Sequence, residues 1–262
     1  MKWLVALLSI SAVAVVMTMT GRGGGNFYVP ILVAVGAPMH VAAASGQFIL
    51  VATAVAAAIL FHKHRAVDWK LALVLDPPTD VMAFVGGYFS AYVAGTTLKL
   101  VMAGLLVLAG FAMLLKVRDR RLTSPKRFGF WRRQFAGETY VVNLWLALPI
   151  TALTGLVAGA VGISGGSFKV PLMVLACGVP MRVAVGTSSL MIAATATMGL
   201  AGHAVQGHFD PYWALPMAGV AVLGGVVGSK FALKTKPKRL KILFAFTTLA
   251  AAAFMATNAL LP

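Results

Sequence analysis

Residues 21–33 read GRGGGNFYVPILV, and residues 162–174 read GISGGSFKVPLMV. At an offset of 141 the two stretches share seven of thirteen positions, including a Gly-Gly pair and the proline five residues after it. After one inserted residue the match continues at an offset of 142, as far as Leu98-Lys99 against Leu240-Lys241. An offset held over this length indicates that the chain is a duplication of one unit.

The composition places this unit in a membrane. Of the 262 residues, 60% are apolar and 11% are charged, which is too little charge to cover the surface of a soluble domain. Most of the apolar stretches are long enough to cross a bilayer core about 30 Å thick. They lie near residues 3–20, 41–61, 71–94, 98–115, 141–161, 183–205, 211–233 and 240–261. We therefore predict an all-α integral membrane protein that passes several times through the cell inner (plasma) membrane.

The first apolar stretch could also be a signal peptide, since it follows Lys2. The duplication argues for a helix instead, because it pairs this stretch with one in the interior of the chain.

Two further apolar stretches, 27–36 and 168–177, are too short to cross alone, because ten helical residues rise only about 15 Å. If each one crosses, 18 basic residues, Arg22 among them, lie on the side of the basic linker and 2 lie opposite. If each dips in and returns, the counts are 12 and 8. Positive residues favour the cytoplasmic side, so the first arrangement is predicted.

That arrangement consists of two inverted-topology repeats of about five helical segments each, with one short half-helix in each repeat. We assign residues 1–115 to the first transmembrane repeat, 116–137 to a basic cytoplasmic linker and 138–262 to the second transmembrane repeat. Both termini are then expected outside the cell.

Several classes of function are disfavoured. The net charge of +16 does not indicate a nucleic-acid partner, because the basic residues lie mostly in connectors and form no stripe interleaved with aromatic residues. Cys177 is the single cysteine and cannot form an internal disulfide. The sequence has no metal-ligand spacing, no nucleophile elbow and no phosphate-binding GxxxxGK[ST] motif, so we expect no enzyme, cofactor or metal.

The duplicated glycine turns form a candidate anion site. In an inverted pair the two turns enter from opposite faces and meet near the midplane, where the first turns of the short helices present unpaired N–H groups. Glycine allows φ > 0 and close approach of a ligand. The alternative is that these glycines only permit tight helix crossing. The predicted substrate-binding residues of the turns are Gly24, Gly25, Asn26 and Phe27 with Gly165, Gly166 and Ser167.

The next helix of each half opens with polar residues whose hydroxyl and amide groups could donate hydrogen bonds to an oxyanion. They are Ser45 and Gln47 in the first half and Thr187, Ser188 and Ser189 in the second. Alternatively, the hydroxyl groups bond back to a helix carbonyl. Lys169, whose repeat mate is Tyr28, is expected to balance the anion or to gate its release, unless it snorkels to a wet surface.

Asp76, Asp80 and His203 are candidates for a proton relay that would couple transport to protons. Asp76 and Asp80 bracket Pro77-Pro78 in an apolar stretch, and Asp beside Pro is also an ordinary helix cap. The sequence does not decide between the two roles.

The chain resembles the TauE/SafE family of membrane proteins, whose members are linked to export of sulfite and of organosulfur anions. The resemblance covers nearly the whole chain and rests on the doubled turn GRGGGNFYVP and GISGGSFKVP, on GTSSL at Gly186–Leu190 and on GGVVGSKFAL at Gly224–Leu233. The family's usual GxGGG is present at Gly21–Gly25, but Ser164 replaces the middle glycine in the second turn. The resemblance implies an anionic substrate without specifying which one.

We therefore predict a transporter that exports small sulfur-containing anions, such as sulfite or organosulfonates, by alternating access. Its partners are the small anionic substrate and the lipid bilayer, and the sequence allows a homo-oligomer. The alternatives are an uptake carrier or channel for another small anion and a non-transporting membrane scaffold.

Overall fold

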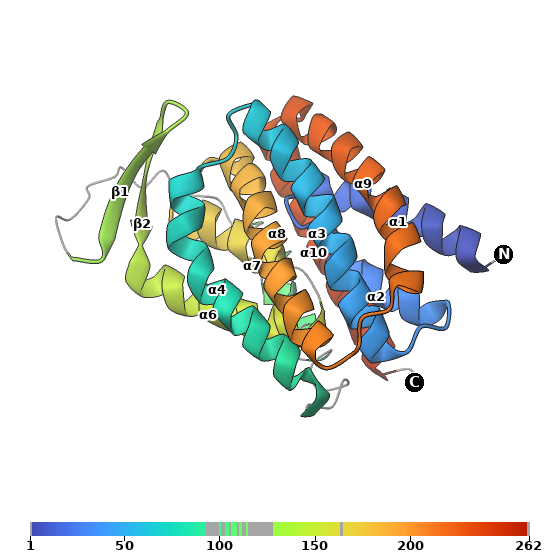
Figure 1. Cartoon of the computed structure of the whole chain (residues 1–262). Helices are drawn as coiled ribbons and strands as arrows, with labels where there is room; N and C mark the ends of the chain where they lie inside the picture. The colour runs from blue at the N-terminus through green and yellow to red at the C-terminus, as the bar shows by residue number, and fades with distance from the viewer. Residues whose placement is uncertain are drawn as a thin grey trace.

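The chain folds into a bundle of helices with one small β-hairpin at its side (Figure 1). The computed structural model describes residues 2–92, 100, 103–104, 106–108, 110–111, 114, 128–162 and 165–260. The first half contains α1 (Lys2–Met19), α2 (Gly25–Ala34), α3 (Met39–Lys63), α4 (Trp69–Phe89) and the 3-10 turn η1 (Ser90–Tyr92). The second half contains α6 (Leu144–Val161), α7 (Gly166–Pro171), the π-helical η2 (Leu172–Ala176), α8 (Met181–Val205), α9 (Pro211–Lys234) and α10 (Pro237–Leu260).

Four of the described helices, α3, α6, α8 and α9, are long and apolar enough to cross a membrane. Helix α2 has ten residues and α7 with η2 spans residues 166–176, so both are shorter than the bilayer core, as the sequence predicts. The chain is therefore a helical membrane protein. Half of the expected helix 98–115 and residues 116–127 of the linker lie outside the described residues.

The two halves pack through equivalent contacts. Helices α1 and α6 are offset by 142 residues at both ends, and so are α3 and α8. Helix α1 packs on α9 as α6 packs on α4, and α3 packs on α9 as α8 packs on α4. The equivalence extends to single residues: a Cβ at Gly21 would lie 2.8 Å from Val185 Cα, and one at Gly162 would lie 2.7 Å from Ala43 Cα.

Glycines also set the separation of neighbouring helices. Where α4 crosses α6, a Cβ at Gly155 would lie 2.1 Å from the Thr79 carbonyl oxygen, and one at Gly159 would lie 2.1 Å from that of Ala83. Small residues at such crossings let membrane helices approach closely. Gly155 and Gly159 therefore permit the close crossing of α4 and α6. Both glycines lie outside the two duplicated turns.

A two-stranded hairpin precedes α6. Strands β1 (Phe130–Phe135) and β2 (Glu138–Asn143) pair antiparallel, with Phe130 opposite Asn143. Ala136 and Gly137 join them with φ of 53° and 82°, which is the backbone of a type I′ turn. The sequence analysis did not include this hairpin, and residues 141–143, expected in an apolar helix, are strand. The division of the chain at 115 and 137 stays a prediction.

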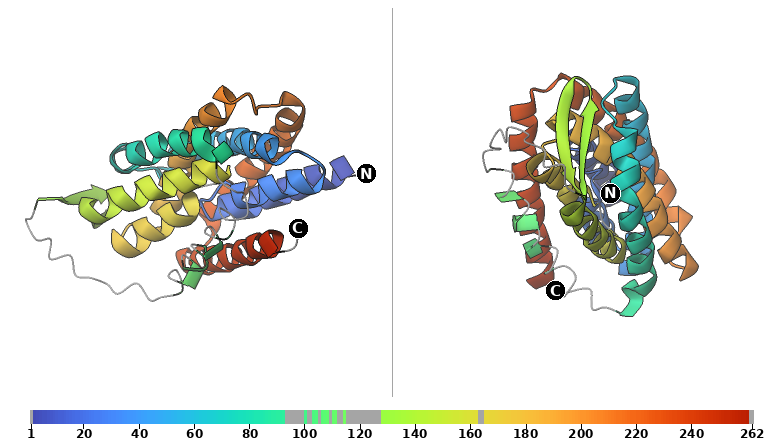
Figure 2. Two further views of the ribbon diagram at one scale, coloured as in Figure 1. Left: turned by 90° about the horizontal axis from the view of Figure 1, so that it is seen from below. Right: turned by 90° about the vertical axis from the view of Figure 1, so that its left-hand side faces the viewer.

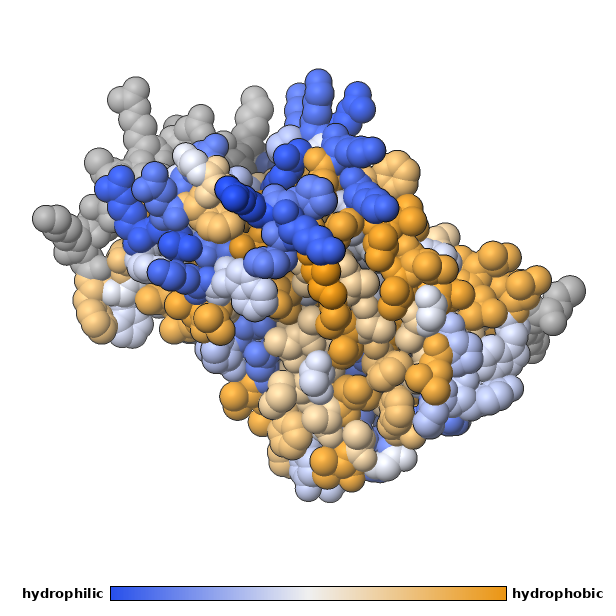
Figure 3. Space-filling model, turned by 45° about the horizontal axis from the view of Figure 1, so that its top comes forward, coloured by the Kyte–Doolittle hydropathy of each residue, from blue (hydrophilic) through white to orange (hydrophobic). Residues whose placement is uncertain are grey.

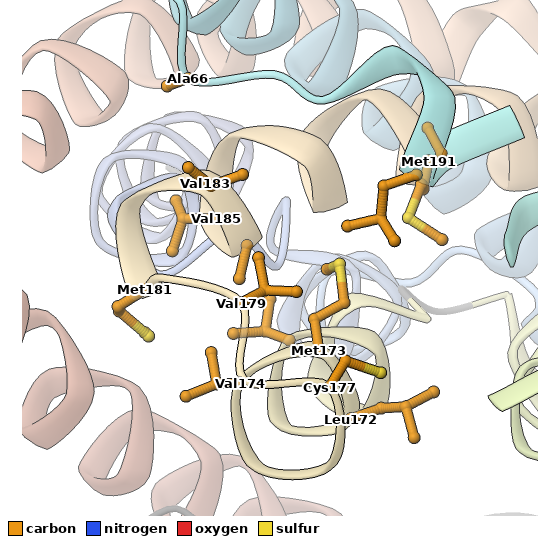
Figure 4. Close-up of a cluster of buried hydrophobic side chains, with 14 of the residues drawn as sticks. Ala66, Leu172, Met173, Val174, Cys177, Val179, Met181, Val183, Val185 and Met191 are labelled. Atoms are coloured by element: carbon orange, nitrogen blue, oxygen red, sulfur yellow. The ribbon is translucent and has the colours of Figure 1, made fainter. Parts of the chain in front are cut away.

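The second short helix is anchored in the largest apolar cluster. Leu172 and Met173 of η2 and Cys177 pack against the start of α8, around Val179 and Val183 (Figure 4). Met173 is fully buried. Helix α10 lies on the opposite side of the molecule from α3 and α4, with α6 and α7 between them (Figure 2). The second short helix is thus surrounded by protein.

Exposed basic residues gather at one end of the bundle. The α3–α4 and α9–α10 connections lie at the same end, beside the hairpin (Figure 1). That end forms a continuous hydrophilic surface, and the sides below it are largely apolar (Figure 3). The exposed basic residues of the two connections are Lys63, Arg65 and Lys70, and Lys234, Lys236, Lys238 and Arg239.

Candidate anion-binding site

The two duplicated turns meet. Asn26 is the second residue of α2 and Ser167 the second residue of α7, and both side chains are buried. Asn26 Nδ2 donates a hydrogen bond to Ser167 Oγ at 3.0 Å. These residues are repeat mates at the offset of 141, so equivalent positions of the two halves contact each other. The structure therefore brings the predicted turn residues together.

Only some of the turn glycines are required by backbone conformation. Gly24 is left-handed, with φ of 97°, whereas Gly165 has an ordinary φ of −68°. The freedom of glycine to adopt φ > 0 is therefore used at Gly24 but not at Gly165. Gly166 is required by space, since a Cβ there would lie 2.6 Å from the Gly21 carbonyl oxygen and 3.0 Å from Arg22 Cα.

The polar residues that open α3 and α8 have different roles. Ser188 Oγ donates to the Gly21 carbonyl at 2.8 Å and so holds the first turn, and Thr187 Oγ1 accepts from the Asp68 amide. Ser189 donates to the Val185 carbonyl, which is the back-bonding alternative. Phe27 stacks on Phe254 of α10 at 5.7 Å between ring centroids, an apolar contact.

Several buried polar atoms near the turns have no hydrogen-bond partner among the described residues. They are Asn26 Oδ1, Ser45 Oγ and Gln47 Oε1. Gln47 uses its amide nitrogen to reach the Ala158 carbonyl at 3.3 Å. Buried polar groups are usually paired, so a set of unpaired ones indicates a place where a solute or water binds.

Lys169 is neither exposed nor free. Its Nζ lies 2.5 Å from Asp76 Oδ1 and 2.7 Å from Thr195 Oγ1, and the side chain is buried. The snorkelling alternative is therefore wrong. Asp76 lies in the middle of α4, so the capping alternative is wrong for it as well; the N-cap of α4 is Asp68. Thr195 also donates to Asp80 Oδ1 at 2.9 Å, which joins both aspartates to the lysine.

His203 lies elsewhere. It is buried on α8, with Nε2 at 3.1 Å from the Gly159 carbonyl and Nδ1 at 3.5 Å from Ser90 Oγ. None of its hydrogen bonds within the described part of the chain involves Asp76, Asp80 or Lys169. The structure thus groups two of the three proposed relay residues with Lys169 and leaves His203 apart.

Arg22 is a buried residue of the first turn that the sequence analysis did not single out. It was expected in a cytoplasmic loop, but it is 1% exposed and its guanidinium reaches α10. Without Arg22 the basic residues still favour the arrangement in which each short stretch crosses. Arg22 leaves the larger group of basic residues in that arrangement, and it leaves the smaller group in the arrangement in which each short stretch dips in and returns. Its position inside a duplicated turn, where its repeat mate is Ile163, was the signal that could have identified it.

A charged cluster fixes the hairpin to the helices. Asp68 caps α4 and accepts hydrogen bonds from Arg133 Nε at 2.9 Å, from Arg133 Nη2 at 3.0 Å and from the Tyr140 hydroxyl. Burial alone would raise the pKa of the Asp68 carboxyl, but the hydrogen bonds from Arg133, Tyr140 and the Leu71 amide outweigh it and hold the pKa below its ordinary value. The carboxylate therefore stays charged and joins α4 to the hairpin.

Replacing Asp68 by Asn is expected to lower the free energy of unfolding by about 2–3 kcal/mol, because Arg133 loses its charged partner. A carboxyl whose pKa is depressed in the folded state stabilises the fold above its unfolded pKa of about 4, and this stabilisation is lost as pH falls through the folded-state pKa. Thermal unfolding in detergent across this acidic range should show the loss in the wild type but not in Asp68→Asn. The control is Asp210→Asn, at the repeat mate that caps α9 without an ion pair in the described residues; it should change stability by less than about 0.5 kcal/mol, because asparagine caps a helix as well as aspartate does.

Comparison with known proteins agrees with this architecture. The family described as sulfite exporter TauE/SafE matches residues 6–255. The probable membrane transporter protein YunE of Bacillus subtilis is 26% identical over 233 residues, covering 84% of this chain and 85% of that protein. YdhB of the same organism, also described as a probable membrane transporter protein, is 21% identical over 227 residues, covering 86% and 88%. No solved structure matches the chain.

The membrane-spanning helices and these relatives together define a membrane transporter. A probable membrane transporter protein of Xylella fastidiosa is likewise 26% identical over 231 residues. Because the family match covers nearly all of the sequence, the chain belongs to the TauE/SafE family.

Proposed function

We propose that the protein exports small sulfur-containing anions, such as sulfite or organosulfonates, across the inner membrane by alternating access. The observation that carries this proposal is the contact of Asn26 with Ser167, which puts the amino ends of the two short helices side by side within the protein. Amino ends of helices present N–H groups and a positive dipole, so they favour an anion. The description of the family supplies the sulfur-containing substrate and the direction.

The buried groups around this contact fit a small oxyanion. The Asn26 amide and the Ser167 hydroxyl bond to each other, and both can turn to donate to a ligand instead. Asn26 Oδ1 and Ser45 Oγ have no hydrogen-bond partner among the described residues, so these two atoms lose no hydrogen bond when their side chains turn toward a ligand. A hydrogen bond between the halves that opens when substrate enters suits a site reached alternately from each side.

We further propose that the two halves are inverted and that the basic end of the bundle faces the cytoplasm. The exchange of equivalent contacts between the halves supports a two-fold relation. The exposed lysines and arginines at one end support the orientation, since positive residues are retained inside (Figure 3).

Cysteine labelling tests this orientation. In a Cys177→Ala background, Lys236→Cys lies in the α9–α10 connection, and Tyr212→Cys lies at the opposite end of α9, where Tyr212 is 65% exposed. A membrane-impermeant maleimide should label Tyr212→Cys in intact cells and Lys236→Cys only after permeabilisation. The reversed labelling pattern would contradict the proposed orientation.

Flux of labelled sulfite into proteoliposomes tests the function itself. We expect saturable flux that protein-free liposomes lack, because a carrier with one site is limited by its turnover. Repeating the measurement with an imposed pH gradient shows whether transport is coupled to protons, in which case the gradient accelerates flux; loss of that acceleration in Asp80→Asn would assign the coupling to the aspartates. Absence of saturable flux for every sulfur oxyanion would refute the proposed substrate.

A further inference from the structure

Arg22 carries a buried positive charge with only neutral partners in the described residues. Its exposed fraction is 1%. Of the six acidic residues, Asp119 lies outside the described residues, and the other five form no ion pair with Arg22; the described ion pairs are Arg133–Asp68 and Lys169–Asp76. An uncompensated charge in a protein interior costs several kcal/mol, so Arg22 is not explained by stability.

The hydrogen bonds of the guanidinium leave one edge available. Nη1 donates to Thr248 Oγ1 at 2.5 Å, to Thr247 Oγ1 at 3.0 Å and to the Phe244 carbonyl at 3.3 Å. Nη2 donates to the Thr247 carbonyl at 3.3 Å, whereas Nε has no partner in the described part of the chain. Nε and Nη2 form the side of a guanidinium that binds an oxyanion through two parallel N–H groups.

The backbone of Arg22 belongs to one of the two turns that form the candidate site. Arg22 belongs to the turn that joins α1 to α2, and its backbone contacts α7, since a Cβ at Gly166 would lie 3.0 Å from Arg22 Cα. Ser188 fixes the turn through the Gly21 carbonyl. The phenyl ring of Phe244 lies 5.2 Å from the guanidinium carbon and forms an apolar wall.

The other buried cation cannot supply the same charge. Lys169 lies against Asp76 at 2.5 Å, so its charge is already balanced within the protein. Only one positive charge near the turns is therefore left unbalanced by the described residues, and that charge is on Arg22.

We infer that Arg22 is the counter-charge of the transported anion and restricts the site to singly charged oxyanions, such as hydrogen sulfite and organosulfonates. This inference rests on the proposed function. A monoanion on the Nε–Nη2 edge makes a neutral pair, whereas a dianion leaves one negative charge uncompensated in an apolar interior. Doubly charged sulfite and sulfate should therefore bind much more weakly.

The wild-type protein in proteoliposomes tests this without any substitution. Methanesulfonate keeps a single charge at every working pH, whereas hydrogen sulfite becomes doubly charged as pH rises through neutrality. Labelled methanesulfonate flux should stay nearly constant with pH, and inhibition of that flux by unlabelled sulfite should weaken at least about tenfold toward alkaline pH. Sulfate should inhibit poorly throughout.

Two variants test the residue. Arg22→Gln should weaken the half-saturation of methanesulfonate flux at least about tenfold, and Arg22→Lys, which keeps the charge but loses the two-pronged edge, should fall between it and the wild type. Arg182→Gln is the matched control, since Arg182 is exposed at the start of α8, and it should behave as the wild type.

The outcomes separate the two proposals. Equal inhibition by sulfate and hydrogen sulfite, or wild-type half-saturation in Arg22→Gln, would overturn the role of Arg22 while methanesulfonate flux itself persists. A wild-type protein that moves neither methanesulfonate nor sulfite would overturn the proposed function, and the ligand of Arg22 with it.

Discussion

Lys169→Met is expected to lower the free energy of unfolding by about 3–5 kcal/mol, the usual effect of removing one partner of a buried ion pair. Methionine matches the length of the lysine stem, so the apolar packing is largely kept. What is lost is the ammonium group 2.5 Å from Asp76 and 2.7 Å from Thr195. The carboxyl of Asp76 must then stay charged without a partner, which burial disfavours, or take up a proton, which costs free energy at neutral pH.

Thermal and denaturant unfolding of the purified protein in detergent measures this loss. Asp76→Asn should destabilise in the same way, and the double variant Lys169→Met/Asp76→Asn should recover at least about 1 kcal/mol relative to the sum of the single effects. The control is Lys70→Met on the same helix as Asp76, where the lysine is exposed; it should change stability by less than about 0.5 kcal/mol. Additive single effects would show that the two residues do not act as a pair.

The ion pair with Asp76 gives Lys169 a partner that the sequence does not identify. From the sequence, Lys169 is a cation in an apolar segment, and its partner is unknown because Asp76 lies 93 residues away on another helix. Hydropathy shows that a charge is buried, but it does not show which opposite charge reaches it. We propose the role of balancing the anion for Arg22, whose charge has no acidic partner in the described residues, and a role in gating for the Lys169–Asp76 pair, which joins α7 of one half to α4 of the other.

The repeat made much of the fold predictable. The offset of 142 that the sequence shows after the turns is the offset between the ends of α3 and α8, and the ends of α1 and α6, which precede the turns, differ from the offset of 141 by one residue. The contact of Asn26 with Ser167 also follows from the prediction that equivalent turns meet. A duplication constrains long-range structure, because each contact between the halves requires a second one made by equivalent residues.

Symmetry could not predict the residues that break it. Arg22 has Ile163 as its repeat mate and Lys169 has Tyr28, so neither buried cation has a charged counterpart in the other half. Thr247 and Thr248, which hold Arg22, are more than 220 positions away from it in the sequence. The hairpin was missed for a related reason: its short strands are attached through Asp68, whose partners Arg133 and Tyr140 lie 65 and 72 residues away.

Gly166→Ala is expected to reduce flux by about 100-fold, because the two turns can no longer keep their present separation. A methyl group there would lie 2.6 Å from both the Gly21 carbonyl oxygen and Ile192 Cδ1. Ile192 can rotate, but the Gly21 carbonyl is backbone and is held by Ser188. The first turn must therefore move away from α7, which displaces Arg22 and separates Asn26 from Ser167.

The cost to stability should be smaller than the cost to flux. One added methyl group in a packed interior costs about 1–3 kcal/mol, which a folded bundle tolerates. Proteoliposome flux and thermal unfolding should therefore be measured on the same preparation, beside Gly219→Ala on α9, where an added Cβ has nothing within 4 Å and should change neither quantity. A non-transporting scaffold predicts that Gly166→Ala affects folding alone, with no flux to lose in either protein. Selective loss of flux in a well-folded variant would exclude that alternative and would show that the distance between the two turns determines transport.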